Sequence, residues 1–255
     1  MKAAGDLFHC LLILCTTLPR CEQAPPRWHW QEILVAELMQ IGEVSTNELE
    51  LAMVCCLIMS AATGDKGCIK AVCNLKEKGF LSLEALAKAN QGEVELAIKQ
   101  CGLQRISAKF LIGVSKEVLR RPDKCFPRDY SKMTELSGLG PKATNVLMNE
   151  VFKFATGAPT DRHVEAGAVA LRLHVSPPWL KTRNVEHTEI SLRTWLCITQ
   201  CKHINPIMGC MAQLFCTRHR AVKESDKEDL HCLMLAVEDH IHNRYHMVVD
   251  CFSSH

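Results

Sequence analysis

Apolar residues recur every three to four positions along most of this chain, and this periodicity limits the fold more than any other feature. The pattern is clear in QEILVAELMQI at residues 31–41 and in ELELAMVCCLIMSAA at residues 48–62. Asn47 is placed to cap the second of these helices, and Gly64 is placed to end it. Period-two alternation of β-branched residues between turns is essentially absent before residue 245. The sequence therefore predicts an all-α fold.

Changes in composition divide the chain into three parts. The Pro-rich segment 24–30 (APPRWHW) is typical of a linker. Before it, Lys2 and the apolar run LFHCLLILCTTL are similar to a secretory signal, but polar residues interrupt the run and it is too short to span a bilayer. After residue 220 the composition changes abruptly to charged residues. We expect an N-terminal apolar segment and linker at 1–27, a helical domain at 28–220 and a C-terminal tail at 221–255.

The charge and cysteine content argue against a strongly basic DNA-binding protein and against a disulfide framework. Thirty Lys and Arg residues against 28 Asp and Glu residues give a net charge of only +2, so any contact with DNA must come from local patches. The 15 cysteines are irregularly spaced and odd in number. This pattern favours buried, reduced thiols over a disulfide framework. A secreted helical protein held together by disulfides remains an alternative because of the N-terminal run.

A tight turn with two glycines separates two helical patterns at residues 137–142 (SGLGPK). Gly138 and Gly140 allow a hairpin with positive φ, and Pro141 suits the first turn of the helix that follows. Main-chain N–H groups at such a helix start can bind a phosphate. Taken alone, the pattern is more typical of an ordinary turn between helices.

The longer string around this turn resembles the helix-hairpin-helix and Gly/Pro-Asp motif of the endonuclease III family of DNA glycosylase/AP lyases. LSGLGPKATNVLMNEVF is followed, 19 residues after Lys142, by Asp161. NELELAMVCCLIMSAATGDKG resembles the family's helix ending in a Ser-x-Gln-Thr-x-Asp segment, CGLQRISAKFLI its Gly-x-x-x-x-Lys-Ala helix, and WLCITQCKHIN its Trp-Leu…Ile-Asn stretch. The resemblance covers roughly residues 28–216 and implies a two-lobed helix-hairpin-helix DNA glycosylase fold.

The same resemblance implies that Lys142 is a nucleophile and Asp161 is its carboxylate partner. A lysine amine can attack the sugar C1′ of a damaged nucleotide, expel the base and form a Schiff base that leads to strand cleavage by β-elimination. The carboxylate accepts a proton and stabilises the charge that develops on the sugar. Taken separately, Lys142 could be a solvated lysine and Asp161 a simple helix cap. Candidate DNA-binding residues are Gly138, Gly140, Lys109, Lys132 and His163.

Several residues depart from the family pattern on the DNA side. Ala62 stands where the family has a Gln that fills the gap left by an extruded base. The family's Val-Asp-Thr-His is TDRH at 160–163, and the arginines expected after the His are Ala166 and Ala170. These losses remove hydrogen-bonding groups and positive charge, so we expect weaker contact with a lesion.

The family's 4Fe-4S cluster needs cysteines spaced C-x6-C-x2-C-x5-C, and this chain lacks such a set. Cys216 matches the first ligand with no others following, or Cys210 and Cys216 match the last pair with none preceding. We therefore expect no cluster, no other cofactor and no metal. A zinc site is arithmetically possible but fits no standard spacing; its ligands would be Cys201, His203, Cys210, Cys216 and His219.

Together these features predict a monomeric base-excision repair enzyme, a DNA N-glycosylase with AP-lyase activity on oxidised pyrimidines. Its expected partner is double-stranded DNA with a damaged base or an abasic site, without any membrane. The resemblance implies the nucleus or the mitochondrion, which a working N-terminal signal would contradict. The alternative is a catalytically degenerate paralogue that binds DNA or a protein, and it is favoured by Ala62, the missing cluster and the low net charge.

Overall fold

A computed structural model describes residues 30–162, 164–165, 168 and 185–195 of the chain. The chain divides into two compact units: Pro26–Thr156, called here the helical unit, and a second unit made of Met1–Pro25 and Gly157–His255. Within the described residues every regular element is a helix, as the sequence predicted. None of these helices is both long and apolar enough to cross a membrane. The predicted boundaries at residues 28 and 220 stay predictions.

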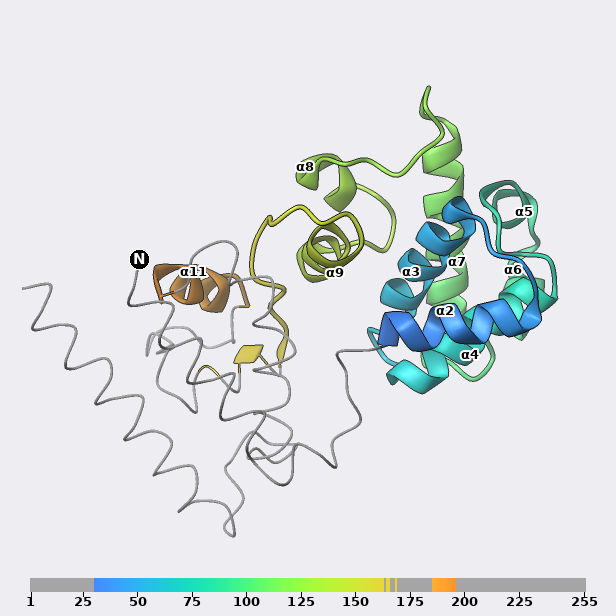
Figure 1. The fold of residues 1–255 in the computed structure, drawn as a ribbon, viewed down its shortest axis with the longest axis horizontal. Helices are drawn as coiled ribbons and strands as arrows, with labels where there is room; N and C mark the ends of the chain where they lie inside the picture. The colour runs from blue at the N-terminus through green and yellow to red at the C-terminus, as the bar shows by residue number, and fades with distance from the viewer. Residues whose placement is uncertain (1–29, 163, 166–167, 169–184, 196–255) are drawn as a thin grey trace, which may run out of the picture. The chain divides into compact units, whose positions relative to one another are not determined.

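Figure 1 labels most of the helices described below. In the helical unit they are α2 (Trp30–Ile41), α3 (Thr46–Met59), α4 (Asp65–Glu77), α5 (Leu83–Lys88), α6 (Gln91–Ala97), α7 (Gln104–Leu119), α8 (Tyr130–Thr134), α9 (Pro141–Val146) and the π-helical turn η2 (Leu147–Val151). The second unit contains α11 (Val185–Trp195).

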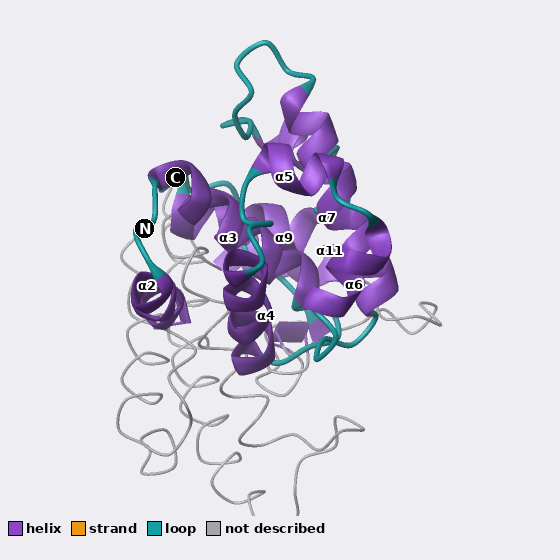
Figure 2. Cartoon of the chain, turned by 90° about the vertical axis from the view of Figure 1, so that its right-hand side faces the viewer, coloured by secondary structure: helices purple, strands orange, loops and turns teal. Residues whose placement is uncertain are grey.

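The core of the helical unit forms around α3, which packs against α4, α7 and η2 (Figure 2). Most of α3 is buried, because apolar residues occupy nearly every position from Leu51 to Met59. Its neighbour α7 buries Leu111, Val114 and Val118 on one side. Burial of each such large apolar side chain contributes about 1.5–3 kcal/mol. The helices α3 and α7 therefore form a well-packed core on which other helices of the unit pack.

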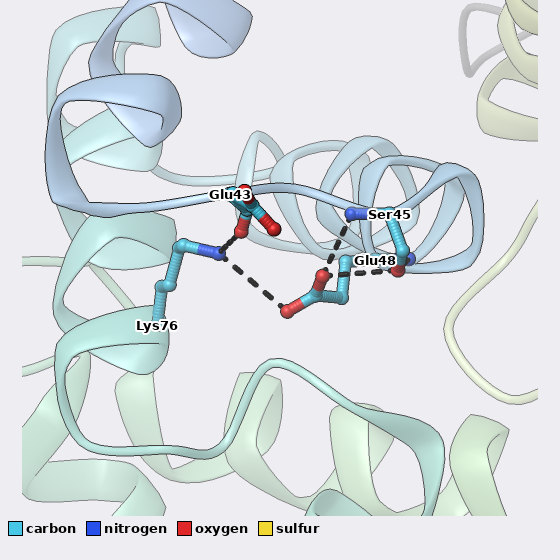
Figure 3. A network of polar contacts seen from close by, with 4 residues as sticks. All are labelled: Glu43, Ser45, Glu48 and Lys76. Atoms are coloured by element: carbon cyan, nitrogen blue, oxygen red, sulfur yellow. Dashed lines mark hydrogen bonds and ion pairs between the residues drawn. The ribbon is translucent and has the colours of Figure 1, made fainter.

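The start of α3 differs from the sequence prediction. The cap is Ser45 rather than Asn47: the Ser45 Oγ accepts a hydrogen bond from the Glu48 N–H at 3.2 Å, and the Ser45 N–H donates to Glu48 Oε2 at 2.8 Å. Lys76 from α4 joins this capping box through its Nζ, which donates to the Glu43 carbonyl at 2.6 Å and lies 3.5 Å from Glu48 Oε1 (Figure 3). Two reciprocal hydrogen bonds favour the cap at Ser45 over the single bond that Asn47 offers.

Gly64 also has a different role from the predicted one. The α3 helix ends at Met59 with Ser60 as its C-cap, and Gly64 is instead the N-cap residue of α4. Ser82 caps α5, since its side chain accepts a hydrogen bond from the Ala85 N–H. The segment between Ser60 and Gly64 is therefore a connection that contains Ala62.

Candidate functional site

The glycine turn predicted from the sequence lies between α8 and α9, and we call residues 137–140 the hairpin. Gly138 adopts φ +80, as expected for a glycine turn. Gly140 is extended, with φ −84 and ψ 177, and precedes Pro141 at the first position of α9. Gly140 is exposed, and a Cβ there would meet nothing within 4 Å. Its backbone is therefore open to close approach by a ligand.

Lys142 is the second residue of α9 and is half-buried. The helical backbone continues directly from α9 into η2. On this segment Asn145 accepts a hydrogen bond from the Thr156 hydroxyl at 2.9 Å, and Asn149 Oδ1 accepts one from the Thr156 N–H at 3.0 Å. The segment that carries Lys142 thus also fixes the end of the helical unit.

Asp161 belongs to the second unit, and its side chain caps the helical turn that follows it. Its Oδ1 accepts a hydrogen bond from the Val164 N–H at 2.9 Å, and its carbonyl accepts one from the Glu165 N–H at 2.9 Å. Asp161 therefore does act as a helix cap, the alternative to a catalytic role that the sequence allowed. Capping and catalysis are compatible, because a carboxylate has two oxygens and about four acceptor positions.

The other predicted DNA-binding residues have different outcomes. Lys109 on α7 and Lys132 on α8 are both exposed. His163 lies outside the described residues. Counted from Gly102, the lysine of the Gly-x-x-x-x-Lys-Ala pattern is replaced by Ser107, which is buried. Lys109 is thus the first lysine after Gly102 in this helix.

A contact near Ala62 was not predicted from the sequence. A Cβ on Gly102 would lie 2.5 Å from the Ala62 carbonyl oxygen, and the Gly102 N–H donates to the Thr63 hydroxyl at 3.0 Å. The next residue, Leu103, has φ 55 and leaves 55% of its surface exposed. Leu103 is one of three non-glycine residues with positive φ in the described part of the chain, a conformation that costs about 1–2 kcal/mol. The structure therefore presents an exposed apolar side chain directly after the glycine that packs on Ala62.

Arg128, in the segment before α8, was also missed, because its partners are distant in sequence. Its guanidinium forms an ion pair with Glu50 on α3 and lies 3.6 Å from the centre of the Phe152 ring, which follows η2. The cation–π contact and the ion pair tie this segment to α3 and to the end of η2. Arg128 is thus one of the links between the hairpin region and the core.

The described cysteines are free thiols, in agreement with the composition. Five of them are buried or half-buried, and burial raises the pKa of Cys55 to about 12. In the described part of the chain no group of three His, Cys, Asp or Glu residues could hold a metal ion. Cys210, Cys216 and the other zinc candidates lie outside the described residues. The cysteine spacing of the sequence does not fit the four-ligand pattern of a cluster.

Comparison with known proteins gives endonuclease III homologues. The chain is 27% identical over 174 residues to "Endonuclease III homolog 1, chloroplastic" of Arabidopsis thaliana, covering 67% of this chain and 45% of that protein. It is 21% identical over 220 residues to "Endonuclease III-like protein 1" of Gallus gallus, covering 78% and 76%. Against the two Arabidopsis homologues the chain spans less than half of the relative's length.

Solved structures show the same fold. A trapped endonuclease III–DNA covalent intermediate matches with a TM-score of 0.59 at 20% identity, covering 74% of this chain and 85% of that chain. A non-covalent endonuclease III–DNA complex also matches with a TM-score of 0.59, at 21% identity. At these identities the likeness establishes the helix-hairpin-helix glycosylase architecture.

A match to a family model shows which protein family the chain belongs to. The model of the HhH-GPD superfamily base excision DNA repair proteins matches residues 55–184, just over half of the chain. The match includes α7, the hairpin, Lys142 and Asp161. This chain therefore belongs to the HhH-GPD superfamily of base excision DNA repair proteins.

Proposed function

We propose that this protein is a DNA glycosylase with AP-lyase activity, with Lys142 as the nucleophile and Asp161 as the carboxylate that assists it. The observation that carries the proposal is the position of Lys142. It follows directly on a hairpin with an accessible glycine backbone, on a helix anchored to the core, in a chain of the base excision repair superfamily.

The proposed reaction begins when the unprotonated Nζ of Lys142 attacks the sugar C1′ of the damaged nucleotide. The bond from C1′ to the base breaks, and the base leaves with the electron pair and takes up a proton. The sugar ring then opens to a Schiff base on Nζ. Removal of a 2′ proton expels the 3′ phosphate by β-elimination. Asp161 stabilises the positive charge that develops on the sugar.

In this proposal the hairpin binds a phosphate of double-stranded DNA through the backbone at Gly138 and Gly140. The exposed side chains of Lys109 and Lys132 add positive charge, and His163 is a further candidate. These phosphate contacts fix the register of the protein on the duplex without reading its sequence. Action on oxidised pyrimidines is part of the proposal and rests on the likeness to endonuclease III.

Leu103 gives this site a way to open the duplex. Proteins that distort DNA often insert apolar side chains between base steps, at a cost of a few kcal/mol per unstacked step. Leu103 is exposed, has a left-handed backbone and directly follows Gly102, which packs against Ala62. Ala62 itself cannot form a hydrogen bond with the base left unpaired when its partner is extruded. We therefore propose that Leu103 inserts between base steps as an apolar wedge.

The proposal includes no iron–sulfur cluster, because the cysteine spacing does not supply its ligands. It places a monomer in the nucleus or the mitochondrion, where its DNA substrate is found. Every chemical step above uses only the protein's own side chains and the DNA.

Borohydride trapping tests the proposed chemistry. The full chain is incubated with a duplex that contains one abasic site, sodium borohydride is added, and covalent protein–DNA product is measured by denaturing electrophoresis. We expect a product with the wild type and none with Lys142→Ala, while Lys153→Ala, a control at another lysine of the helical unit, keeps it. Absence of product with folded wild-type protein contradicts the lyase mechanism.

A degenerate DNA-binding paralogue is the second candidate. Ala62 and the net charge of +2 favour it, since both weaken engagement of a lesion. Abasic-duplex binding that is unchanged by Lys142→Ala, together with no trapped product from the wild type, establishes this alternative.

A further inference from the structure

One side of α7 forms a seat for the hairpin, made by three residues spaced three and four positions apart. Phe110 faces Gly138, because a Cβ on Gly138 would lie 2.8 Å from the Phe110 Cβ. Gly113 faces Ser137, because a Cβ on Gly113 would lie 3.0 Å from the Ser137 Oγ. Glu117 follows one turn later on the same side of the helix. The hairpin therefore lies directly on α7.

Glu117 makes the polar part of this contact. Its Oε2 accepts a hydrogen bond from the Ser137 N–H at 2.8 Å, and its Oε1 accepts one from the Ser137 hydroxyl. Both oxygens of one half-buried carboxylate thus bind one residue at the first position of the hairpin. Hydrogen bonds to an ionised carboxylate are roughly twice as strong as neutral ones and fix the geometry of both partners.

The position of this carboxylate is unexpected for a DNA-binding surface. The hairpin is proposed to approach a phosphate, and a negative charge close to a phosphate weakens binding. The Ser137 N–H and hydroxyl both donate to the Glu117 carboxylate, which should hold the hairpin in place and so favour DNA binding. The negative charge of the same carboxylate should repel a DNA phosphate and so weaken binding. Removing Glu117 therefore separates the two effects by the sign of the change in affinity.

We propose that Glu117 is a positioning residue that holds the hairpin in the conformation that binds a DNA phosphate. This inference rests on the proposed function, because it assumes that the hairpin contacts DNA. Glu117 acts through Ser137 and does not itself touch the substrate. We call the two hydrogen bonds from Ser137 to Glu117 the clamp. Without the clamp the hairpin samples other conformations, and the apparent affinity for DNA falls in proportion to the fraction of molecules whose hairpin can bind.

Glu135 provides a matched control. It lies at the end of α8, just before the hairpin, and its side chain is exposed. Among the described residues its carboxylate forms no hydrogen bond or ion pair. Glu135→Ala and Glu117→Ala change the net charge equally and near the same place. Only Glu117→Ala removes the two bonds to Ser137.

The test measures binding of the full chain to an abasic duplex over a range of salt concentrations. We expect Glu117→Ala to weaken binding about tenfold, from the loss of two charge-assisted hydrogen bonds and the smaller competent fraction. Its slope of log K against log salt should also become shallower by about 0.9, the value for one lost phosphate contact. Glu135→Ala should bind as tightly as the wild type or more tightly, with no shallower slope.

Two further variants distinguish positioning from a general structural defect. Glu117→Gln keeps an oxygen that can accept from the Ser137 N–H, so it should restore binding to within about threefold of the wild type. At saturating DNA, Glu117→Ala should give the same final yield of borohydride-trapped product as the wild type, because Lys142 is unchanged. An affinity of Glu117→Ala equal to or above that of Glu135→Ala overturns the inference.

Hydrogen–deuterium exchange tests the clamp without DNA. In Glu117→Ala the amides of residues 136–140 should exchange at least about tenfold faster than in the wild type, while peptides from α3 keep their protection. Unchanged exchange in the hairpin overturns the inference even if binding is weaker. Failure of the wild type to bind DNA overturns the proposed function, and with it the DNA role of Glu117, whereas tight binding by Glu117→Ala overturns the inference alone.

Discussion

Replacing Gly138 with alanine should lower the free energy of unfolding by about 3 kcal/mol. Two independent costs combine at this position. Gly138 has φ +80, a conformation that costs other residues about 1–2 kcal/mol. The new Cβ would also lie 2.8 Å from the Phe110 Cβ and 3.0 Å from its Cγ, which are too close for carbon atoms.

The clash is difficult to relieve, because the Phe110 Cβ is joined directly to the backbone of α7. A third contact, 3.3 Å to Ile58 Cγ1, limits movement toward α3. Overpacking of this kind usually costs about 1–3 kcal/mol. Adding the backbone strain gives a total of about 2–5 kcal/mol, with 3 as a central value.

Gly140 is the natural control because it lies in the same hairpin. Its φ is −84 and a Cβ there meets nothing within 4 Å, so Gly140→Ala should change stability by less than about 0.5 kcal/mol. Urea denaturation followed by circular dichroism measures both variants, with equal m-values showing that the transitions are comparable. Equal destabilisation by the two substitutions, or none by Gly138→Ala, would refute the packing argument.

Three other predictions concern separate parts of the helical unit. Glu48→Ala should lower the free energy of unfolding by about 1 kcal/mol at pH 7. The Ser45 N–H lowers the pKa of Glu48, so this difference should shrink as the pH falls below 4.5; a constant difference on acid titration would contradict it. At pH 8 a maleimide should modify the exposed Cys125 quickly and Cys55, whose pKa burial raises to about 12, only on unfolding; equal labelling by mass spectrometry would disprove this. Leu103→Ala should leave stability within about 0.5 kcal/mol of the wild type but weaken binding to a lesion duplex about tenfold, and unchanged affinity would exclude the wedge.

The helices could be predicted from sequence where a local pattern determines them. Apolar spacing predicted α2 and α3. The α3 cap was misplaced, since the choice of Ser45 over Asn47 depends on a reciprocal bond with Glu48 and on Lys76 from another helix. Boundaries depend on such competition between nearby caps, which periodicity does not resolve.

In the candidate site, too, local features could be predicted from the sequence and tertiary contacts could not. The hairpin was predicted because two glycines and a proline leave few backbone conformations. The contact of Glu117 with Ser137 joins residues 20 positions apart, and the exposure of Leu103 depends on how Gly102 packs against Ala62. Such tertiary contacts have no periodic signal. Lys142 and Asp161 were selected by resemblance, and their joint role is still a prediction.

The substitutions on the DNA side leave the internal support of the site intact. Gly102 packs on the backbone of Ala62, a contact that does not depend on the side chain at position 62. The hairpin is held by Phe110, Gly113 and Glu117, all on α7. One helix therefore carries Leu103 at its start and the seat of the hairpin 7–14 residues later, or about 10–21 Å at 1.5 Å per residue. Since this spacing is set by the core, loss of DNA contacts should reduce affinity before it disturbs the geometry around Lys142. Trapping yield at saturating DNA is thus a better measure of retained chemistry than activity at low concentration.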